Sequence, residues 1–256
     1  MIGIMDSGVG GLTVLKELRT LLPGEGFLYF GDNANNPFGN RSKDELLSFN
    51  RRMLDFFRAR SVAAAVIACN TTSVLEELLQ AEYDFPLLGI IRPIVRRVCG
   101  SGLERVGVVA TRFTIESGAY RRLIKAGAPR IAVYEKADYH LAGMIDRGEF
   151  NSPALVEEVA KIGEWIKTSG VDHVILACTH YPVVREVFES AAPGVTFLDP
   201  AVEQAETLAA IMKKKKLLRN ESGKTVIFTS GNPALFPPVL EKLGLPPGEC
   251  PVQRFG

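Results

Sequence analysis

The sequence has few of the residues that build metal centres and disulfide frameworks. Its 256 residues include four cysteines and three histidines, and the cysteines at positions 69, 99, 178 and 250 form no CxxC pair. Neither a zinc site nor a disulfide framework is therefore expected, and the thiols should be reduced.

An excess of charge of either sign is also missing. The chain has 30 Lys and Arg against 29 Asp and Glu, for a net charge of +1. It lacks the basic excess that binds nucleic acids or acidic membrane surfaces, so neither partner is expected. The basic run at residues 213–216 is interpreted as a solvated helix end.

Long apolar runs are absent as well. No run approaches the roughly 20 residues that cross a bilayer. Residues 1–5 lack the basic leader and the small-residue cleavage site of a signal peptide. We therefore expect a cytoplasmic protein.

The chain does contain a regular alternation of short apolar runs with longer segments of helical period. This alternation is typical of α/β folds in which helices cover mostly parallel sheets. Strands are predicted at residues 2–5, 27–30, 63–68, 87–90, 106–110, 131–134, 173–177, 195–198 and 225–229. Helices are predicted at residues 12–22, 43–59, 73–83, 115–126, 154–169, 183–190, 201–212 and 233–243.

The two halves of this pattern resemble each other. In each half the third strand ends in an Ala-Cys pair, at Cys69 and at Cys178, and the first strand ends in a polar residue, Asp6 or Thr111. A duplicated α/β unit is expected to bind its ligand between the copies, beyond the carboxyl ends of the strands. The predicted fold is thus two pseudo-symmetric three-layer α/β domains with an active site in the inter-domain cleft.

The strand near the C-terminus predicts how the chain is divided. Residues 92–100 are interpreted as the crossing into the second unit, and residues 225–229 as a strand that rejoins the first sheet. The first domain is therefore expected to be discontinuous, formed by residues 1–91 plus 206–256. Residues 92–205 are expected to form the second.

Two thiols that face one ligand suggest acid/base chemistry. A free thiol has a pKa of about 8.5 and needs modest tuning to exchange protons near neutral pH. Asp6 is a candidate partner for Cys69, and His180 for Cys178. One thiol would remove a proton from one face of a carbon and the other would return a proton to the opposite face, without metal or pyridoxal. Cys99 and Cys250, the latter near a C-terminus that reads as disordered, are interpreted as structural or incidental.

Further polar clusters follow the other strands. The stretch from Asp6 to Leu12 opens a helix but matches neither GxGxxG nor a P-loop, so it suits a carboxylate better than a nucleotide. The polar loop at residues 31–40 would supply backbone donors, and Thr111 and Thr114 two hydroxyls. Each cluster taken singly is also compatible with a plain turn or helix cap.

The sequence resembles the glutamate racemases of the cofactor-independent aspartate/glutamate racemase superfamily over essentially its whole length. The motifs that carry the resemblance are Asp6-Ser7-Gly8-Val9-Gly10-Gly11, Gly31-Asp32 with Pro37-Phe38-Gly39, Ala68-Cys69-Asn70-Thr71, Thr111 with Thr114, Cys178-Thr179-His180-Tyr181-Pro182, and Thr229-Ser230-Gly231-Asn232-Pro233. The resemblance implies a cofactor-free isomerase that supplies D-glutamate for peptidoglycan, and so for cell-wall biogenesis and cell shape.

The resemblance also implies roles for individual residues. Cys69, assisted by Asp6, would act on D-glutamate, and Cys178, assisted by His180, on L-glutamate. The residues implied to hold the substrate, partly through backbone groups, are Ser7, Pro37, Phe38, Gly39, Asn70, Thr71, Thr111, Thr114 and Thr179.

Several positions depart from the family pattern. Asn33, Asn35 and Phe38 stand where the family's loop usually has Thr, Arg and Tyr. Asp146 falls at the family's active-site glutamate and is one methylene shorter, and Arg92 places a cation where a neutral or acidic residue is common. Phe38 is compatible with the pattern if that position contributes its backbone.

Three other functions stay open from the sequence. A related racemase would act on aspartate or another small acid, and an acid-binding α/β protein would keep the pocket without turnover. A thiol redox protein would form a Cys69–Cys178 disulfide on mild oxidation. The partner expected is a small-molecule substrate, glutamate, and a homodimer is left open.

Overall fold

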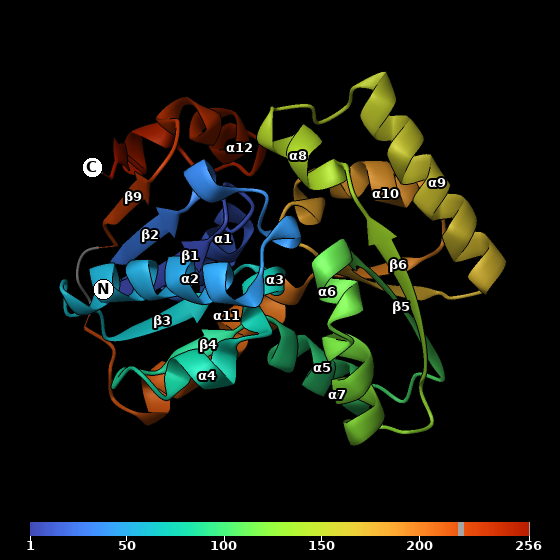
Figure 1. The fold of residues 1–256 in the computed structure, drawn as a ribbon, viewed down its shortest axis with the longest axis horizontal. Helices are drawn as coiled ribbons and strands as arrows, with labels where there is room; N and C mark the ends of the chain where they lie inside the picture. Colours follow the sequence, from blue (N-terminus) through green and yellow to red (C-terminus); the bar gives the residue numbers. More distant parts are fainter. Residues whose placement is uncertain (220–222, 256) are drawn as a thin grey trace.

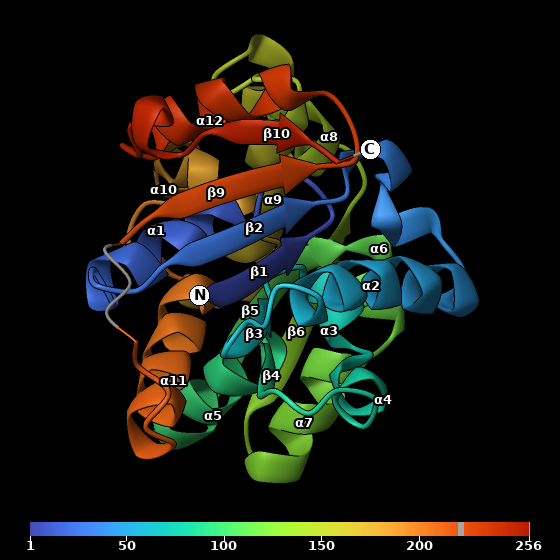
Figure 2. The same cartoon turned by 90° about the vertical axis from the view of Figure 1, so that its left-hand side faces the viewer.

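Two parallel β-sheets organise the chain in the computed structural model, which describes residues 1–219 and 223–255. The first sheet has the strand order β10-β9-β2-β1-β3-β4 and the second the order β6-β5-β7-β8. Figure 1 shows them as two lobes side by side, and Figure 2 shows the twisted first sheet from β10 to β4. The strands are β1 Ile2–Asp6, β2 Phe27–Gly31, β3 Ala64–Ile67, β4 Leu87–Gly89, β5 Arg105–Thr111, β6 Ala132–Asp138, β7 His173–Ala177, β8 Thr196–Leu198, β9 Thr225–Thr229 and β10 Val252–Arg254.

The two sheets share one strand order. The sequence β2-β1-β3-β4 in the first sheet is repeated as β6-β5-β7-β8 in the second, with parallel pairing throughout. The predicted pair of pseudo-symmetric α/β units is therefore confirmed. Because the order is the same, Cys69 after β3 and Cys178 after β7 occupy equivalent positions.

Helices cover the sheets on both faces. They are α1 Leu12–Leu21, α2 Lys43–Arg58, α3 Asn70–Ser73, α4 Glu76–Gln80, α5 Ile91–Gly100, α6 Arg112–Glu116, α7 Ala119–Gly127, α8 Leu141–Asp146, α9 Pro153–Ser169, α10 Arg185–Ala191, α11 Pro200–Lys214 and α12 Phe236–Lys242. Short 3₁₀ turns lie at Asn33–Asn35, Phe38–Asn40, Tyr181–Val184, Pro233–Leu235 and Pro247–Glu249.

Local sequence signals explain several helix ends. Ser42 and Glu45 form a capping box at the start of α2, each side chain bonded to the other residue's backbone N–H. Ser152 caps α9 ahead of a proline, and Gly170 ends that helix with a left-handed φ of 65°. Serine, proline and glycine at these positions therefore mark helix boundaries by known stereochemistry.

The core follows from the alternation of side chains along the central strands. Ile2 and Ile4 of β1 pack into the cluster on the α1 face, whereas Met5 packs with Phe57 of α2 on the other face. The α1 cluster continues into the second lobe, where it includes Val108 of β5. Helix α11 lies between the lobes and packs against α1 and α5 (Figure 1).

Some predicted elements were wrong in extent. The helix expected at residues 115–126 is split into α6 and α7 at Gly118, whose φ of 62° breaks the helical path. The segment at residues 92–100, interpreted as the crossing into the second unit, does connect β4 of the first sheet to β5 of the second, and it forms helix α5. The C-terminus, which reads as disordered, forms β10 beside β9, and Cys250 ahead of it is fully buried.

The proposed domain boundaries lie at helices. The boundary at residues 91/92 falls at the start of α5 and the boundary at 205/206 inside α11. The discontinuous division into 1–91 plus 206–256 and 92–205 remains a prediction. In the described part of the chain, no helix has the length and apolar character that crossing a membrane requires.

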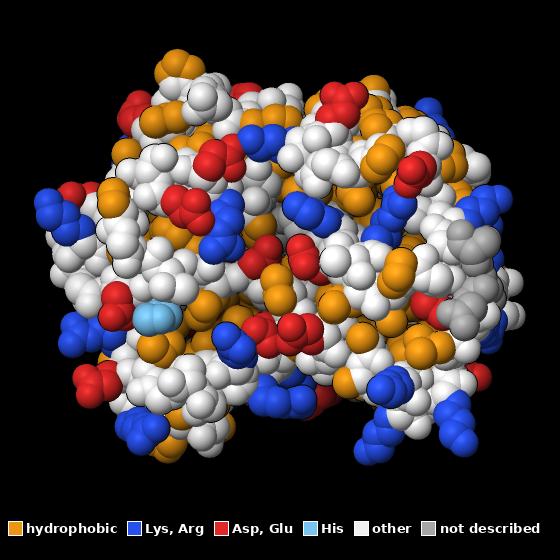
Figure 3. All heavy atoms as spheres, turned by 180° about the vertical axis from the view of Figure 1, so that it is seen from behind, with side chains coloured by type: hydrophobic (Ala, Val, Ile, Leu, Met, Phe, Trp, Pro, Cys, Tyr) orange, Lys and Arg blue, Asp and Glu red, His pale blue; other side chains and the backbone are white. Residues whose placement is uncertain are grey.

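The surface carries both signs of charge in close alternation. Figure 3 shows Lys and Arg side chains interspersed with Asp and Glu over the face opposite to that of Figure 1. The side chains of Lys213, Lys214, Lys215 and Lys216 are exposed at the end of α11, as expected for a solvated helix end.

Gln204 fastens α11 to the first sheet. Its buried side-chain amide donates to the carbonyls of Ile67 at 3.0 Å and Leu88 at 2.9 Å. Gln204→Ala leaves both carbonyls without this donor and is expected to lower the free energy of unfolding by roughly 2–4 kcal/mol. Urea denaturation measures the change. The control Gln253→Ala, at an exposed position, should change it by less than about 0.5 kcal/mol.

Candidate active site

A cavity of about 560 Å³ lies where the carboxyl ends of the two sheets face each other. Eleven of the thirteen residues proposed from the sequence line it, and Asp6 and Thr114 lie directly behind the lining. The lining residues are Ser7, Asn33, Asn36, Pro37, Phe38, Gly39, Cys69, Asn70, Thr71, Thr111, Arg112, Asp138, Tyr139, Ala142, Gly143, Asp146, Arg147, Cys178, Thr179, His180 and Leu235. The volume is in the usual range for small-molecule sites.

Cys69 stands between β3 and α3, where the strand ends in extended backbone. Its side chain is buried, and its sulfur lies 3.7 Å from the Ser7 hydroxyl. Burial and the nearby charge of Asp6 raise the pKa of the Cys69 thiol, an effect that its contacts with the Thr72 backbone and the Ser7 side chain oppose. Cys69 is therefore a protonated thiol at neutral pH in this site.

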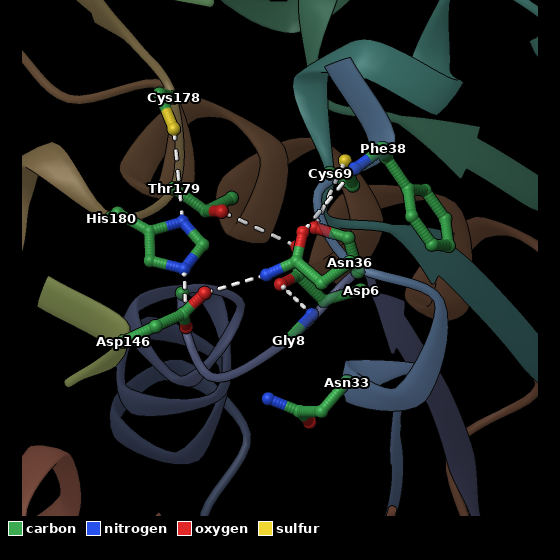
Figure 4. A network of polar contacts seen from close by, with 12 residues as sticks. Asp6, Gly8, Asn33, Asn36, Phe38, Cys69, Asp146, Cys178, Thr179 and His180 are labelled. Carbon is green, nitrogen blue, oxygen red and sulfur yellow. Dashed lines mark hydrogen bonds and ion pairs between the residues drawn. The ribbon is translucent and has the colours of Figure 1, made fainter. Parts of the chain in front are cut away.

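Cys178 follows β7 and has His180 as its neighbour. The sulfur lies 3.7 Å from His180 Nδ1, and His180 Nε2 lies 2.9 Å from Asp146 Oδ1 (Figure 4). Burial lowers the pKa of His180, but the carboxylate of Asp146 and the Cys178 sulfur outweigh it and raise that pKa well above the ordinary value. The imidazolium lies at the distance at which a proton can pass to or from the sulfur.

Asp6 acts on the site from behind the cavity lining. Its carboxylate accepts hydrogen bonds from Gly8 N–H at 3.0 Å and from the Thr179 hydroxyl at 3.3 Å. Burial raises the pKa of Asp6, and the charge of His180 opposes that rise. The neighbour of the Cys69 sulfur is the Ser7 hydroxyl, so the influence of Asp6 on Cys69 is exerted through its charge.

Hydroxyl and amide groups meet across the cavity. Thr71 from the first sheet and Thr111 from the second have their hydroxyls 3.2 Å apart, and Thr114 lies 3.1 Å beyond Thr111. Asn70 accepts a hydrogen bond of 2.6 Å from the Tyr120 hydroxyl of α7. Its buried side-chain nitrogen has no hydrogen-bond partner among the described residues, which leaves a donor for a bound carboxylate.

The loop after β2 forms one wall through its backbone. Phe38 is buried with its ring against Phe49, turned away from the cysteines (Figure 4), so its contribution to the cavity wall is mainly its main chain. Asn35 points elsewhere, its amide binding the carboxylate of Asp32, which also pairs with Arg52 at 2.6 Å. The position at which the family usually has arginine thus serves to hold this loop.

The sequence-based set of site residues omitted seven polar residues that line the cavity, and also Tyr120 behind it. The seven are Asn33, Asn36, Arg112, Asp138, Tyr139, Asp146 and Arg147. The sequence marks Asp146 only as the position of the family's active-site glutamate, and Asn36 only as part of the polar loop at residues 31–40. Asp138 pairs in register with Thr111, and would have been found had β6 been predicted to its full length. Tyr120 lies within a helix and has no sequence signal that marks it, because its hydroxyl reaches the site only through the packing of α7.

The geometry permits proton exchange on two sides of a bound molecule. The cysteines come from different sheets and face one cavity, and each has a polar neighbour. The unpaired Asn70 side-chain nitrogen and several hydroxyl groups also lie around this cavity. No group of three or more His, Cys, Asp or Glu side chains within residues 1–219 and 223–255 is arranged to hold a metal ion. All four cysteines are free.

Comparison with known proteins places these features in a family. The profile of the Asp/Glu/hydantoin racemase family matches residues 2–208. The glutamate racemase of Thermoanaerobacter sp. (strain X514) is 39% identical over 234 residues, which cover 90% of this chain and 88% of that protein.

Solved structures agree with this match. Glutamate racemase isoform RacE1 from Bacillus anthracis superposes with a TM-score of 0.91 at 30% identity, covering 100% of this chain and 97% of that one. The glutamate racemase from Francisella tularensis subsp. tularensis SCHU S4, in complex with D-glutamate, has a TM-score of 0.90 at 29% identity and the same coverage. The chain belongs to the Asp/Glu/hydantoin racemase family, among the glutamate racemases.

Proposed function

We propose that this protein interconverts L-glutamate and D-glutamate by two-base proton transfer at Cα. The observation that carries the proposal is the pair of cysteines, Cys69 and Cys178, which leave equivalent strands of two sheets and line one cavity. The relatives named above, one of them solved with D-glutamate bound, support glutamate as the substrate.

Each direction uses one sulfur as base and the other as acid. With L-glutamate, the Cys178 thiolate removes the α-proton, and the Cys69 thiol donates its proton to the opposite face, leaving D-glutamate and a Cys69 thiolate. With D-glutamate, the roles are exchanged. Asp6 and His180 adjust the protonation of the two sulfurs, and water restores the starting state between turnovers.

The α-proton of an amino acid is hard to remove, so the developing charge must be held. The unpaired side-chain nitrogen of Asn70 and the hydroxyls of Thr71 and Thr111 are proposed to donate to the substrate carboxylate as it gains enolate character, and Thr179, whose hydroxyl donates to Asp6, is proposed to bind through its backbone. Ser7, Pro37, Phe38, Gly39 and Thr114 complete the proposed binding set. If the cavity closes over the bound substrate and excludes water, these donors become stronger.

The D-glutamate that the reaction produces would be used to build the cell wall. D-glutamate is a component of peptidoglycan, so the proposed role is in cell-wall biogenesis and the maintenance of cell shape. The four free cysteines, two of them in the site, fit the reducing cytoplasm, where we expect the enzyme to act.

Incubation with each enantiomer in deuterated water tests the function. We expect deuterium at Cα of glutamate and loss of optical rotation from either enantiomer, without any added cofactor. Aspartate at the same concentration is the control for substrate choice and should exchange far more slowly. Exchange with aspartate alone would refute glutamate as the substrate. Binding of glutamate without exchange would favour a non-catalytic acid-binding protein.

A further inference from the structure

One hydrogen bond crosses the cavity from the loop of the first sheet to the acid/base residues of the second. The Asn36 side-chain amide donates to Asp146 Oδ2 at 2.5 Å, while the other oxygen of that carboxylate lies 2.9 Å from His180 Nε2. His180 Nδ1 in turn lies 3.7 Å from the Cys178 sulfur. Figure 4 shows these four side chains as one continuous series of contacts.

The orientation of Asn36 is determined at both ends of its amide. Its oxygen accepts a hydrogen bond of 3.3 Å from Phe38 N–H, so its nitrogen is the end that faces Asp146. The opposite orientation would place an amide oxygen against a carboxylate, which has no proton to share. Asn36 therefore joins the cavity wall formed by residues 37–39 to the carboxylate that holds His180.

Asp146 needs such a donor because of where it lies. It is the last residue of α8, beside the carbonyl end of the helix, which disfavours a negative charge. Its side chain is 14% exposed, so without a second contact it has room to turn toward solvent. The other charged or titratable groups that act on His180 are Asp6 at the end of β1 and Cys178 at the end of β7.

We propose that Asn36 is a positioning residue for the Cys178 half of the reaction. It holds Asp146 against His180 from across the cavity, so that the acid/base residues of the second sheet are assembled by a residue of the first. This inference rests on the proposed racemase function. It predicts an asymmetric defect, because the Cys69 side has its own partner in Ser7.

The first experiment follows His180 in the free protein and needs no catalysis. The chain has three histidines, so the His180 ring signals in an NMR titration are identified by their loss in His180→Gln. Asn36→Ala is expected to lower the pH at which His180 titrates by roughly one unit, because Asp146 is no longer held at Nε2. In an Asp146→Asn background the same substitution should have no further effect, since it acts through that carboxylate.

The second experiment measures primary isotope effects with glutamate deuterated at Cα. Asn36→Ala is expected to lower kcat/KM by about tenfold. Because the slowed step is proton transfer at Cys178, the isotope effect should rise for L-glutamate, which Cys178 deprotonates, and fall for D-glutamate. The matched control is Asn35→Ala, in the same loop but bonded to Asp32, which should leave the His180 titration as in wild type and should not move the two isotope effects in opposite directions.

The two experiments separate the two proposals. If wild type exchanges no α-proton, the racemase function fails, while the His180 titration still decides whether Asn36 positions Asp146. If Asn36→Ala leaves the His180 titration unchanged, or alters both isotope effects alike, Asn36 only shapes the loop and the inference is overturned.

Discussion

Cys178→Ser is expected to slow racemization from both enantiomers by roughly 10²–10⁴-fold, and Cys69→Ser should do the same. A serine hydroxyl keeps the size and position of the thiol but is far too weak an acid to exchange protons near neutral pH. Both directions suffer because every turnover uses one sulfur as base and the other as acid. Optical rotation measured from each enantiomer gives the two rates.

The two variants should differ in the enantiomer from which they can still remove the α-proton. In Cys69→Ser the base at Cys178 remains, so slow deuterium exchange into L-glutamate without inversion is expected, and Cys178→Ser should show the same for D-glutamate. Proton NMR in deuterated water follows both. Cys99→Ser, outside the cavity lining, is the matched control and should change kcat by less than about twofold. Full racemase activity in either active-site variant would refute the two-base mechanism.

Gly10→Ala is expected to lower kcat/KM by about 10²-fold while leaving the protein folded, because a misplacement near 1 Å has that effect on catalysis. A β-carbon at residue 10 would lie 2.5 Å from His180 Nδ1 and 2.5 Å from the Thr179 hydroxyl. The imidazole is buried and held by Asp146, so it cannot move aside without leaving the Cys178 sulfur. Steady-state kinetics with both enantiomers measure the loss.

A glycine whose added β-carbon would contact no other atom provides the control for Gly10→Ala. Gly100, at the end of α5, has nothing within 4 Å of an added β-carbon, and Gly100→Ala should keep the activity of wild type. Circular dichroism and urea denaturation of Gly10→Ala distinguish loss of geometry from loss of folding. Normal kinetics in Gly10→Ala would mean that His180 tolerates displacement and is not held at the sulfur as described.

The position of the two cysteine motifs could be predicted from the sequence because the polar residues that follow parallel strands lie at the same edge of a sheet. Cys69 and Cys178 follow apolar runs too short for anything but buried strands, and repetition of the pattern placed them on equivalent strands. Helix limits were less accurate where a single residue overrides helical period, as Gly118 does between α6 and α7. The short strand β10 was missed because its three residues carry little periodic signal.

The contacts that cross the cavity could not be predicted in the same way. The Asn36–Asp146 and Asn70–Tyr120 hydrogen bonds join residues 110 and 50 positions apart in the chain. No local pattern encodes such a pair, because it exists only after both sheets have formed and packed through α1, α5 and α11.

The sequence by itself thus determined the α/β class, the duplicated unit and the two thiols at its strand ends, since each depends on apolar periodicity and on residues close in the chain. Only the tertiary structure decided which groups tune the thiols: Ser7 rather than Asp6 lies against Cys69, and Asp146, held by Asn36, lies behind His180. The physical reason is that a hydrogen bond depends on distances of a few ångströms between side chains, and these distances are set by how the two sheets pack against each other.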